Sequence, residues 1–476
     1  GHAVSTASAA RLTIRAVRST TPARADRRTR PPFWHPIAVA RAPQPNGGIC
    51  AVCGGSDVSL PRRYDPPVPW CPRCERDLST YDVAYAPWRG SKVLGRWGYR
   101  KAFALDDSLV AELGHAPERA GLRTRSELVL RVVSALVVLA SAASFVGAVT
   151  IWRTDLLPPV KFAAAVGLVV VGLWWRPRFG RLEIGEAHRL GADEAPHLRA
   201  LVRQVAEAAG TPEPDVILLD PHELNLWVTR VGLRGRSVLS VGIPLWLMLT
   251  PQMRVAVLAH ELGHLTNADP ARSIFTQPAH HLFRRAVEWT GGSGADRRRA
   301  VDVDEVAQRS LIGLAMAVVL ATINALLTLA QLMVDAAAMP DHRRAEYAAD
   351  LVSRKVAGTQ AARAAIERLA ALDELLVVID YEVTRTPPGK WEAILHVHER
   401  RLADDLPALR QSTRRTTDVW STHPPQGMRL RLIESLPEVG PVVTLDSGSV
   451  LKIDHELSAF YALTHRQWLD TREFHG

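Results

Sequence analysis

Cysteine is scarce in this sequence: only four occur among 476 residues. They form two pairs, Cys50-x-x-Cys53 and Cys71-x-x-Cys74, which a polar, proline-rich stretch separates. This spacing favours a structural zinc ribbon over residues 46–80, because four thiolates in two knuckles give closed tetrahedral coordination. Two disulfides are the alternative, which a reducing cytoplasm disfavours. What such a ribbon would bind stays open: nucleic acid, a protein partner, or nothing beyond its own domain.

The first 45 residues contain almost no acidic side chains and no long apolar run. They hold eight arginines and one acid, Asp26, among many alanine, serine, threonine and proline residues. This composition predicts a disordered basic tail over residues 1–45. Without an apolar core the tail does not resemble a secretory signal peptide, and without an amphipathic period it is a poor transit peptide. The net charge of +9 fits attraction to anionic lipid as readily as to nucleic acid.

Charged residues are also absent from a long apolar segment, residues 132–152, which could cross a bilayer as one helix. A second segment, residues 160–175, is apolar except for Lys161, whose ammonium can reach the headgroups. Tryptophans lie at the segment ends, where interfacial aromatic residues are expected. We predict a transmembrane hairpin over residues 129–176, after a linker over residues 81–128. A buried helical hairpin of a soluble protein is the alternative.

Arginines flank both outer ends of this hairpin, whereas the loop between its two segments has Arg153 offset by Asp155. The positive-inside tendency therefore predicts that both ends face the cytoplasm. On this basis the chain is a multi-pass protein of the cell membrane, with the domains on either side of the hairpin in the cytoplasm.

The segment His260-Glu261-Leu262-Gly263-His264 follows an apolar stretch. On a helix, two histidines four residues apart project from one face. Two neutral imidazoles on one face can bind a zinc ion, and the intervening Glu261 can move protons to and from a water molecule. Two surface histidines on an ordinary helix are the alternative.

A two-histidine zinc site needs a third protein ligand. Glu346 and Asp350 are also four residues apart, so a second helix could present both carboxylates on one face. Glu346 would bind the metal, and Asp350 would accept the free ring N–H of a ligating histidine, with His260 preferred, thereby fixing its tautomer. Pairing of both acids with nearby arginines on a solvated face is the alternative.

A third apolar stretch, residues 311–330, would also satisfy a hydropathy criterion. Because His260 and Glu346 must meet at one metal, an even number of membrane crossings must separate them. The preceding stretch, residues 273–289, carries five charged or ionisable side chains, which are costly at the bilayer centre. We therefore predict that residues 311–330 belong to a long helix that packs on the catalytic domain or lies against the membrane.

Taken in order, these motifs resemble those of the HtpX-type membrane zinc metallopeptidases, which also include the CAAX prenyl endoproteases. The resemblance covers residues 182–440. Its motifs are His260-Glu261-x-x-His264, Asn267-x-Asp269, Arg343-x-x-Glu346-x-x-Ala349-Asp350, Thr422-His423-Pro424-Pro425, Asn225-Leu226-Trp227, and the strand-like Ser237-Val238-Leu239-Ser240-Val241.

The resemblance implies a mainly α (α+β) gluzincin fold. One helix would bear the histidines, a second the glutamate, and a small sheet would offer an edge strand. This metallopeptidase domain would span residues 182–440, with an extension over residues 441–476. Residues 442–453 of the extension have short strand-like runs with a turn at Ser447-Gly448-Ser449.

The resemblance also implies where substrate binds. In that family, peptide substrates pair with the backbone of the edge strand. Here that role would fall to the segment with Ser237, Val238 and Leu239, with Asn225 nearby.

Three further residues receive roles from the resemblance. Arg343 and Asp269 would support the site from outside the ligand set, and Asp269 would tie down a helix end. His423 would stabilise the oxyanion of the transition state. A structural role for His423 at a helix start, before two prolines, is an equally good interpretation.

The implied function is a membrane-anchored zinc endopeptidase whose substrates are misfolded or short-lived membrane proteins. Zinc held by two histidines and one glutamate would activate water, with Glu261 as general base. We expect one catalytic and one structural zinc ion, and no nucleic-acid partner. A prenyl-protein protease fits less well, because that branch has more membrane spans than this chain offers.

The competing hypothesis is a membrane-tethered zinc-ribbon adaptor or nucleic-acid-binding protein with an inactive peptidase domain. The intact Glu261 argues against it, because a pseudoenzyme has no need of a general base. Another zinc hydrolase, such as an amidase, would satisfy the same motif. The natural substrate and the oligomeric state stay open.

Overall fold

A computed structural model describes ten segments of the chain, and every structural statement below concerns them. They are residues 44–59, 70–81, 92–121, 125–155, 157–176, 184–232, 235–266, 311–402, 406–417 and 423–473. The predictions for the basic tail up to residue 43, for Asp269 and for residues 273–289 lie outside these residues.

The first cysteine pair lies between two short antiparallel strands, β1 (Gln44–Ile49) and β2 (Ser56–Ser59). The second pair follows Trp70, whose buried indole forms a small apolar cluster with Leu78. A cluster of two side chains is too small to hold a fold by apolar burial alone. This region therefore depends on a bound metal, on a neighbouring surface, or on both.

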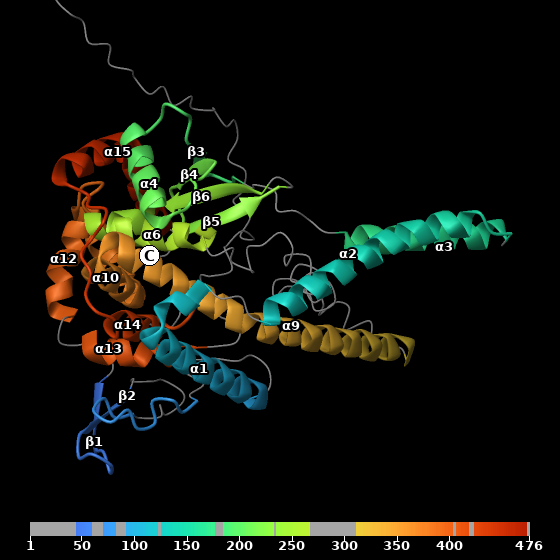
Figure 1. The fold of residues 1–476 in the computed structure, drawn as a ribbon, viewed down its shortest axis with the longest axis horizontal. Helices are drawn as coiled ribbons and strands as arrows, with labels where there is room; N and C mark the ends of the chain where they lie inside the picture. The colour runs from blue at the N-terminus through green and yellow to red at the C-terminus, as the bar shows by residue number, and fades with distance from the viewer. Residues whose placement is uncertain are drawn as a thin grey trace, which may run out of the picture. The chain divides into compact units, whose positions relative to one another are not determined.

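A helical hairpin follows the ribbon region, as Figure 1 shows. The hairpin consists of α2 (Arg125–Trp152) and α3 (Pro158–Trp175). Helix α1 (Lys92–His115) and the 3-10 helix η1 (Pro117–Gly121) precede it. Residues Arg131–Trp152 and Pro158–Trp175 are long and apolar enough to cross a membrane. Only 22% and 11% of their apolar windows are buried in the protein, so most of this apolar surface faces outward.

Small residues let α2 and α3 approach each other closely. The Ser141 hydroxyl donates a hydrogen bond to the carbonyl oxygen of Gly172 at 2.8 Å. A Cβ atom at Gly172 would lie 3.0 Å from the ring of Phe145, so a larger residue would push the helices apart. Such contacts between small residues are typical of helix pairs in lipid, where apolar burial does not drive association.

The peptidase region contains a four-stranded mixed sheet with the order β3-β4-β6-β5. Its strands are β3 (His188–Arg189), β4 (Val216–Asp220), β5 (Leu226–Val231) and β6 (Arg236–Gly242). Strands β4 and β6 run parallel, whereas β3–β4 and β5–β6 are antiparallel pairs.

The sheet order corrects the predicted substrate strand. Ser237, Val238 and Leu239 lie on β6, whose two edges pair with β4 and β5. A strand paired on both sides has no free backbone groups to offer a peptide. Among the strands that the structure describes, β5 instead forms the edge of the sheet on this side. The sequence pattern indicated a strand but did not show whether this strand lies inside the sheet or at its edge.

Helices make up most of the peptidase region, which confirms the predicted mainly helical α+β class. They are α4 (Pro196–Ala209), α5 (Ile243–Met248), α6 (Pro251–Thr266), α9 (Leu311–Ala357), α10 (Thr359–Ala370), α11 (Leu372–Glu382), the 3-10 helix η3 (Val383–Arg385), α12 (Trp391–Leu402), α13 (Leu406–Thr413), α14 (Gln426–Glu434) and α15 (Ser447–Glu473).

Helix α6 is buried on all sides, because it packs on β5, α4, α9 and α10. Its apolar residues belong to the main core together with side chains of the sheet. Gly263 sets its distance from α9: a Cβ atom there would lie 3.2 Å from the Cα of Ala349. This close backbone approach brings the motif on α6 beside the acidic residues on α9.

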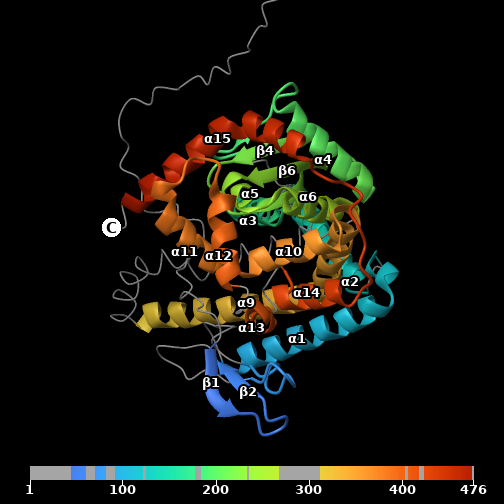
Figure 2. The same ribbon diagram turned by 90° about the vertical axis from the view of Figure 1, so that its left-hand side faces the viewer.

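Helix α9 is continuous from Leu311 to Ala357, with Pro340 inside it, and is roughly 70 Å long at the α-helical rise. The predicted long helix is therefore present, and it contacts both α6 and α2. Figure 2 shows α1, α9 and α14 running beside one another.

The strand-like runs predicted for residues 442–453 are wrong, because α15 begins at Ser447. Asp446 caps this helix: its carboxylate accepts hydrogen bonds from the backbone N–H groups of Gly448 and Ser449 at 2.8 and 3.0 Å. Satisfying these first N–H groups starts a helix where the local residue types had indicated a turn.

Candidate active site

Two histidines on α6 and one glutamate on α9 converge in the buried centre of the peptidase region. His260 and His264 lie one helical turn apart, with ring centroids 5.0 Å from each other. The two carboxylate oxygens of Glu346 lie 3.5 Å from His260 Nε2 and 3.5 Å from His264 Nε2. All three side chains are buried.

These spacings fit a tetrahedral zinc ion. Zinc binds imidazole nitrogen and carboxylate oxygen at roughly 2.0–2.1 Å, so neighbouring ligand atoms of a tetrahedron lie about 3.4 Å apart. The two nitrogen–oxygen distances of 3.5 Å match this edge length. Two imidazoles and one carboxylate are also the donor set of catalytic zinc sites, which keep the fourth position open.

A second layer of charged groups orients His260. Its Nδ1 lies 3.0 Å from Asp350 Oδ1, so the Nδ1–H can donate to this carboxylate while Nε2 faces Glu346. Arg429 on α14 then binds both oxygens of Asp350, at 2.5 and 2.8 Å. Arg429 Nη2 also lies 3.2 Å from His260 Nδ1. Donation from Nδ1–H to Asp350 would leave Nε2 for a metal.

The local charges shift the pKa values of this cluster. Burial and Arg429 both lower the pKa of His260, but its hydrogen bonds to Asp350 and Glu346 outweigh them and raise it to about 9. Burial alone would raise the pKa of Glu346, yet the charges of His423 and His264 hold it well below its usual range. Glu346 is therefore an anion at neutral pH, as a metal ligand must be.

Glu261 lies between the metal donors and the edge strand. Its Oε2 accepts a hydrogen bond from the backbone N–H of Val228 on β5 at 3.2 Å. Because Val228 donates to Glu261, its N–H points away from β6 and toward the catalytic helix. The carboxylate of Glu261 is thus placed between β5 and the donor cluster.

A cavity of about 190 Å³ opens beside these groups. Its polar wall includes His260, Glu261 and His423, and its apolar wall includes Leu245 and Ile366. Asn225 also lines this cavity. The backbone oxygen of Asn225 accepts a hydrogen bond from Gly242 N at 3.0 Å, which ties the start of β5 to the end of β6.

His423 lies at the exposed side of the cluster, and its side chain is 46% exposed. Its Nδ1 is 2.7 Å from Glu346 Oε2. His260, Glu346 and His423 form one group whose ligand atoms all lie within 4.8 Å of one another, and His260, Glu261 and His264 form another. The sequence interpretation did not foresee this direct contact between His423 and the third ligand candidate.

The remaining predicted residues lie farther from the donor cluster. Ser237 exchanges hydrogen bonds with Asp215 at the start of β6: Ser237 N donates to Asp215 Oδ2 at 2.7 Å. Val238 and Leu239 are fully buried. Arg343 is buried beside Asp106 of α1, and its Nε lies 3.7 Å from the Asp106 carboxylate.

Sequence reasoning missed Arg429 and the Val228 N–H. Arg429 lies six residues after His423, within the arginine-containing stretch that follows the two prolines. That stretch was the available signal, although several arginines share it. Every residue except proline has a backbone N–H, so the sequence cannot indicate that the N–H of Val228 contacts Glu261, and only the structure reveals this contact.

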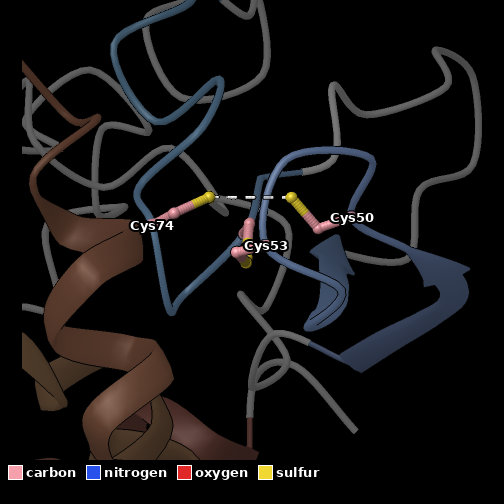
Figure 3. Close-up of side chains that lie close together, drawn as sticks. Cys50, Cys53 and Cys74 are labelled. Atoms are coloured by element: carbon pink, nitrogen blue, oxygen red, sulfur yellow. Dashed lines mark hydrogen bonds between the residues drawn. The ribbon is translucent and has the colours of Figure 1, made fainter.

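The four cysteines form a second candidate metal centre, and Figure 3 shows three of them, Cys50, Cys53 and Cys74. Cys50 Sγ lies 3.6 Å from Cys74 Sγ, and Cys53 Sγ lies 3.3 Å from Cys71 Sγ. All four are free thiols, and their sulfur atoms lie within 4.8 Å of one another. Zinc–sulfur bonds of roughly 2.3 Å give tetrahedral edges of about 3.8 Å, so the four sulfurs can enclose one zinc ion.

The two cysteine knuckles have the same backbone pattern. Cys50 N donates to the Gly55 carbonyl, and Cys71 N donates to the Arg76 carbonyl, five residues on in each case. Desolvation raises the pKa of the Cys50 thiol, but the backbone N–H groups of Cys53 and Val52 outweigh it and lower the pKa to about 7. Aligned N–H groups of this kind stabilise thiolates, which are the form that binds zinc.

The ribbon region binds the segment that ends α13. Glu75 accepts two hydrogen bonds from Arg414, at 2.7 and 3.0 Å. Gln411 donates to the Pro72 carbonyl at 2.8 Å and accepts from the Trp70 indole at 3.2 Å. These contacts join the ribbon to the peptidase region through side chains far apart in sequence.

Comparisons with known proteins agree with this geometry. The family model described as Peptidase family M48 matches residues 192–436. A "Protease HtpX homolog" from Syntrophobacter fumaroxidans is 26% identical over 292 residues, which cover 58% of this chain and 89% of the relative. "Protease HtpX homolog 2" from Methanosarcina acetivorans is 29% identical over 254 residues, covering 52% and 76%.

A third relative, a "Protease HtpX homolog" from Pyrococcus abyssi, is 26% identical over 283 residues, which cover 58% of this chain and 86% of the relative. No solved structure matches the chain. The family match includes α6, the second half of α9 and α14, which carry the donor cluster and Arg429. It does not include the cysteine ribbon, α1 or the α2–α3 hairpin.

Proposed function

This chain belongs to peptidase family M48, and from that membership we propose that His260, His264 and Glu346 hold the zinc ion of an endopeptidase. The chain is a metalloprotease, a hydrolase that acts on peptide bonds, and its substrates are proteins or peptides. The observation that supports these three ligands is the pair of 3.5 Å distances from the Glu346 carboxylate to the two Nε2 atoms.

The protein side of the mechanism follows from the donor geometry. When bound, a zinc ion supplies a Lewis acid that polarises the scissile carbonyl and makes a water molecule more acidic. Glu261 accepts the proton of the attacking water and later delivers it to the leaving amine. The Val228 N–H holds one oxygen of Glu261 at 3.2 Å and so orients the carboxylate before substrate arrives.

Strand β5 is our candidate for the substrate-binding edge, in place of β6. It borders the cavity, and its Val228 N–H faces the catalytic helix. A peptide in extended form would extend the sheet along β5, with one side chain in the apolar part of the cavity near Leu245 and Ile366. His423, at the exposed side of the cluster, is placed to donate to the oxyanion once a substrate carbonyl competes for its contact with Glu346.

The α2–α3 hairpin anchors the enzyme in a membrane in this proposal. Its support is the pair of apolar helices whose side chains face outward. The arginines that flank both ends favour a multi-pass arrangement with the peptidase and the ribbon in the cytoplasm. Misfolded or short-lived membrane proteins are then within reach of the active site, which makes membrane-protein quality control the proposed role.

A second, structural zinc ion is proposed for the ribbon. Four thiols enclose a tetrahedral space, and the apolar cluster beside them consists of only two side chains. We also retain the predicted division into a ribbon (46–80), a hairpin (129–176), a peptidase domain (182–440) and an extension (441–476). The adaptor hypothesis is not favoured, because the family is a peptidase family and the general base is intact.

Casein cleavage by the detergent-solubilised full chain tests this function. Glu261→Gln should lower the rate about 10²–10⁴-fold, because a carboxamide cannot accept the proton. The variant should keep its zinc content. Glu207→Gln, a matched change on the exposed face of α4, should stay within about twofold of the unaltered chain. Wild-type rates in Glu261→Gln would refute the assignment of the base.

A zinc chelator gives the complementary test. Removing zinc from the unaltered chain should abolish casein cleavage, and adding zinc back should restore it. Cleavage that persists without metal would point to a hydrolase of another class.

A further inference from the structure

Helix α1 packs against α9 and α14, although it lies outside the family match. The match begins at residue 192, whereas α1 spans Lys92–His115. Leu109 and Leu113 of α1 pack in one apolar cluster with Tyr347 of α9 and Met428 of α14. Figure 2 shows α1 beside both helices.

Asp106 on α1 is the centre of a buried polar cluster in this contact. Its Oδ1 accepts a hydrogen bond from the Tyr347 hydroxyl at 3.1 Å, and its Oδ2 accepts one from the Thr417 hydroxyl at 3.0 Å. Arg343 Nε lies 3.7 Å from Oδ1, and Arg343 Nη2 lies 3.4 Å from the Thr417 hydroxyl. All four residues have 0% exposure.

Two residues of this cluster, Arg343 and Tyr347, flank Glu346 in the sequence of α9. Arg343 precedes Glu346 by three residues on α9, and Tyr347 follows it by one. Thr417 precedes His423 by six residues, and His423 contacts Glu346 at 2.7 Å. The carboxylate of Asp106 therefore contacts Tyr347, the neighbour of Glu346 on α9, and also Thr417.

Stability alone is a weak explanation for such a cluster. Removing two charges from water is costly, and a buried ion pair is often no more stable than apolar residues of the same volume. Directed hydrogen bonds to a carboxylate do, however, fix the positions of their donors more narrowly than apolar contacts do. Catalytic groups require that accuracy, because a displacement of about 1 Å can cost roughly 10²-fold in rate.

We propose that Asp106 is a positioning residue of the peptidase reaction: through Tyr347 and Arg343 it fixes the turn of α9 that carries Glu346. This inference rests on the proposed role of Glu346 as a zinc ligand. Helix α1 precedes the α2–α3 hairpin and lies outside the family match, but in this proposal it supports the active site.

Substitution of Asp106 in the zinc-loaded full chain tests the proposal by kinetics. Asp106→Asn should lower kcat for casein about tenfold or more while KM stays within about twofold, because only the alignment of the reacting groups changes. Asp106→Glu, which keeps the charge, should recover part of the loss. Asp107→Asn is the matched control: it removes the neighbouring exposed carboxylate, which pairs with Arg431 on α14.

Cobalt substitution gives a second readout that does not depend on activity. Cobalt at the histidine–glutamate site and cobalt at the thiolate site have distinct visible and near-ultraviolet absorption. Asp106→Asn should weaken cobalt binding at the histidine–glutamate site about tenfold, as loss of an outer support does. The thiolate site should keep its affinity and spectrum, and Asp107→Asn should change neither site.

The outcomes separate this inference from the proposed function. If Asp106→Asn keeps the wild-type kcat and cobalt affinity while Glu261→Gln is inactive, the inference is overturned and the proposed function stands. If the unaltered chain does not cleave casein, the proposed function fails, and the cobalt measurement still decides the inference. If Asp106→Asn does not fold, Thr417→Val replaces it: removal of one hydroxyl should lower kcat several-fold, and an unchanged kcat would overturn the inference.

Discussion

Arg429 on α14 binds both carboxylate oxygens of Asp350 on α9, at 2.5 and 2.8 Å. Asp350 in turn contacts His260, so a residue near the carboxyl end of the family match orients a ligand candidate on the central helix. The contacts thus run in series from the Arg429 guanidinium to the Asp350 carboxylate and from there to the His260 imidazole, which is a proposed metal ligand.

Loss of the Asp350 carboxylate should weaken metal binding. Asp350→Asn removes the carboxylate that accepts the Nδ1–H of His260, so zinc affinity at this site should fall about 10–100-fold. Competition with a chromophoric chelator measures this change. Asp335→Asn, on the same helix, is the control and should leave the affinity unaltered. Equal affinities for Asp350→Asn and the unaltered chain would show that this carboxylate does not orient His260.

Loss of the Arg429 guanidinium should instead destabilise the fold. Arg429→Met leaves the fully buried Asp350 carboxylate without its main partner, which should cost about 3–5 kcal/mol of unfolding free energy. Chemical unfolding of the zinc-loaded chain measures it. A cost below about 1 kcal/mol would mean that solvent or another cation compensates Asp350.

Metal content distinguishes the two candidate centres. The chain should bind two zinc ions, of which His264→Ala loses one and Cys50→Ser the other, because each variant removes one ligand from a different site. Elemental analysis of purified protein counts them. A single zinc ion in the unaltered chain, or loss of both ions in His264→Ala, would contradict the assignment of two separate sites.

Proline substitutions on β5 test whether this strand binds substrate. In the antiparallel register with β6, the N–H of Arg230 shares its direction with that of Val228, away from β6. Arg230→Pro should therefore spare the sheet but remove one hydrogen bond to a peptide, lowering kcat/KM roughly 2–10-fold. Thr229→Pro, whose N–H faces β6, should destabilise the protein. Equal kcat/KM values for Arg230→Pro and the unaltered chain would exclude pairing of substrate with this strand.

The contact between the ribbon and α13 should depend on pH. The hydrogen bond from Arg414 holds the pKa of Glu75 below its usual 4.5. A lowered folded pKa stabilises the protein above the unfolded value and ceases to do so as pH falls through the folded value. Glu75→Gln should thus reduce stability at pH 7, by less than about 1 kcal/mol because the Glu75 side chain is half-exposed. The difference from the unaltered chain should shrink as the pH falls below 4.5 and vanish below the lowered pKa of Glu75. A difference that stays constant down to pH 3 would contradict this role.

Local spacing allowed the core of the site to be predicted. His260, Glu261 and His264 lie within two turns of one helix, and the helical period alone sets their common face. Glu346 required more, because it lies 82 residues after His264. It was proposed because a two-histidine site needs a third ligand, and because Glu346 and Asp350, four residues apart, can share one face of a helix. The resemblance then supplied the same order of motifs.

Long-range placement explains what the sequence could not provide. Residues 237–241 are strand-like in sequence, but the interior position of this strand depends on its pairing with β4 and β5. Asp106 has no motif around it, and it becomes informative only when α1 packs against Tyr347. Asp446 lies before a turn-like sequence, and its capping contacts decide that a helix follows.

The most direct test locates zinc by anomalous diffraction at its absorption edge, in crystals of the full chain. We expect a peak at the cysteine ribbon and another about 2.0–2.2 Å from the Nε2 atoms of His260 and His264 and from a carboxylate oxygen of Glu346. A zinc peak bound by the two histidines, with Glu346 beyond coordination distance, would contradict this expectation.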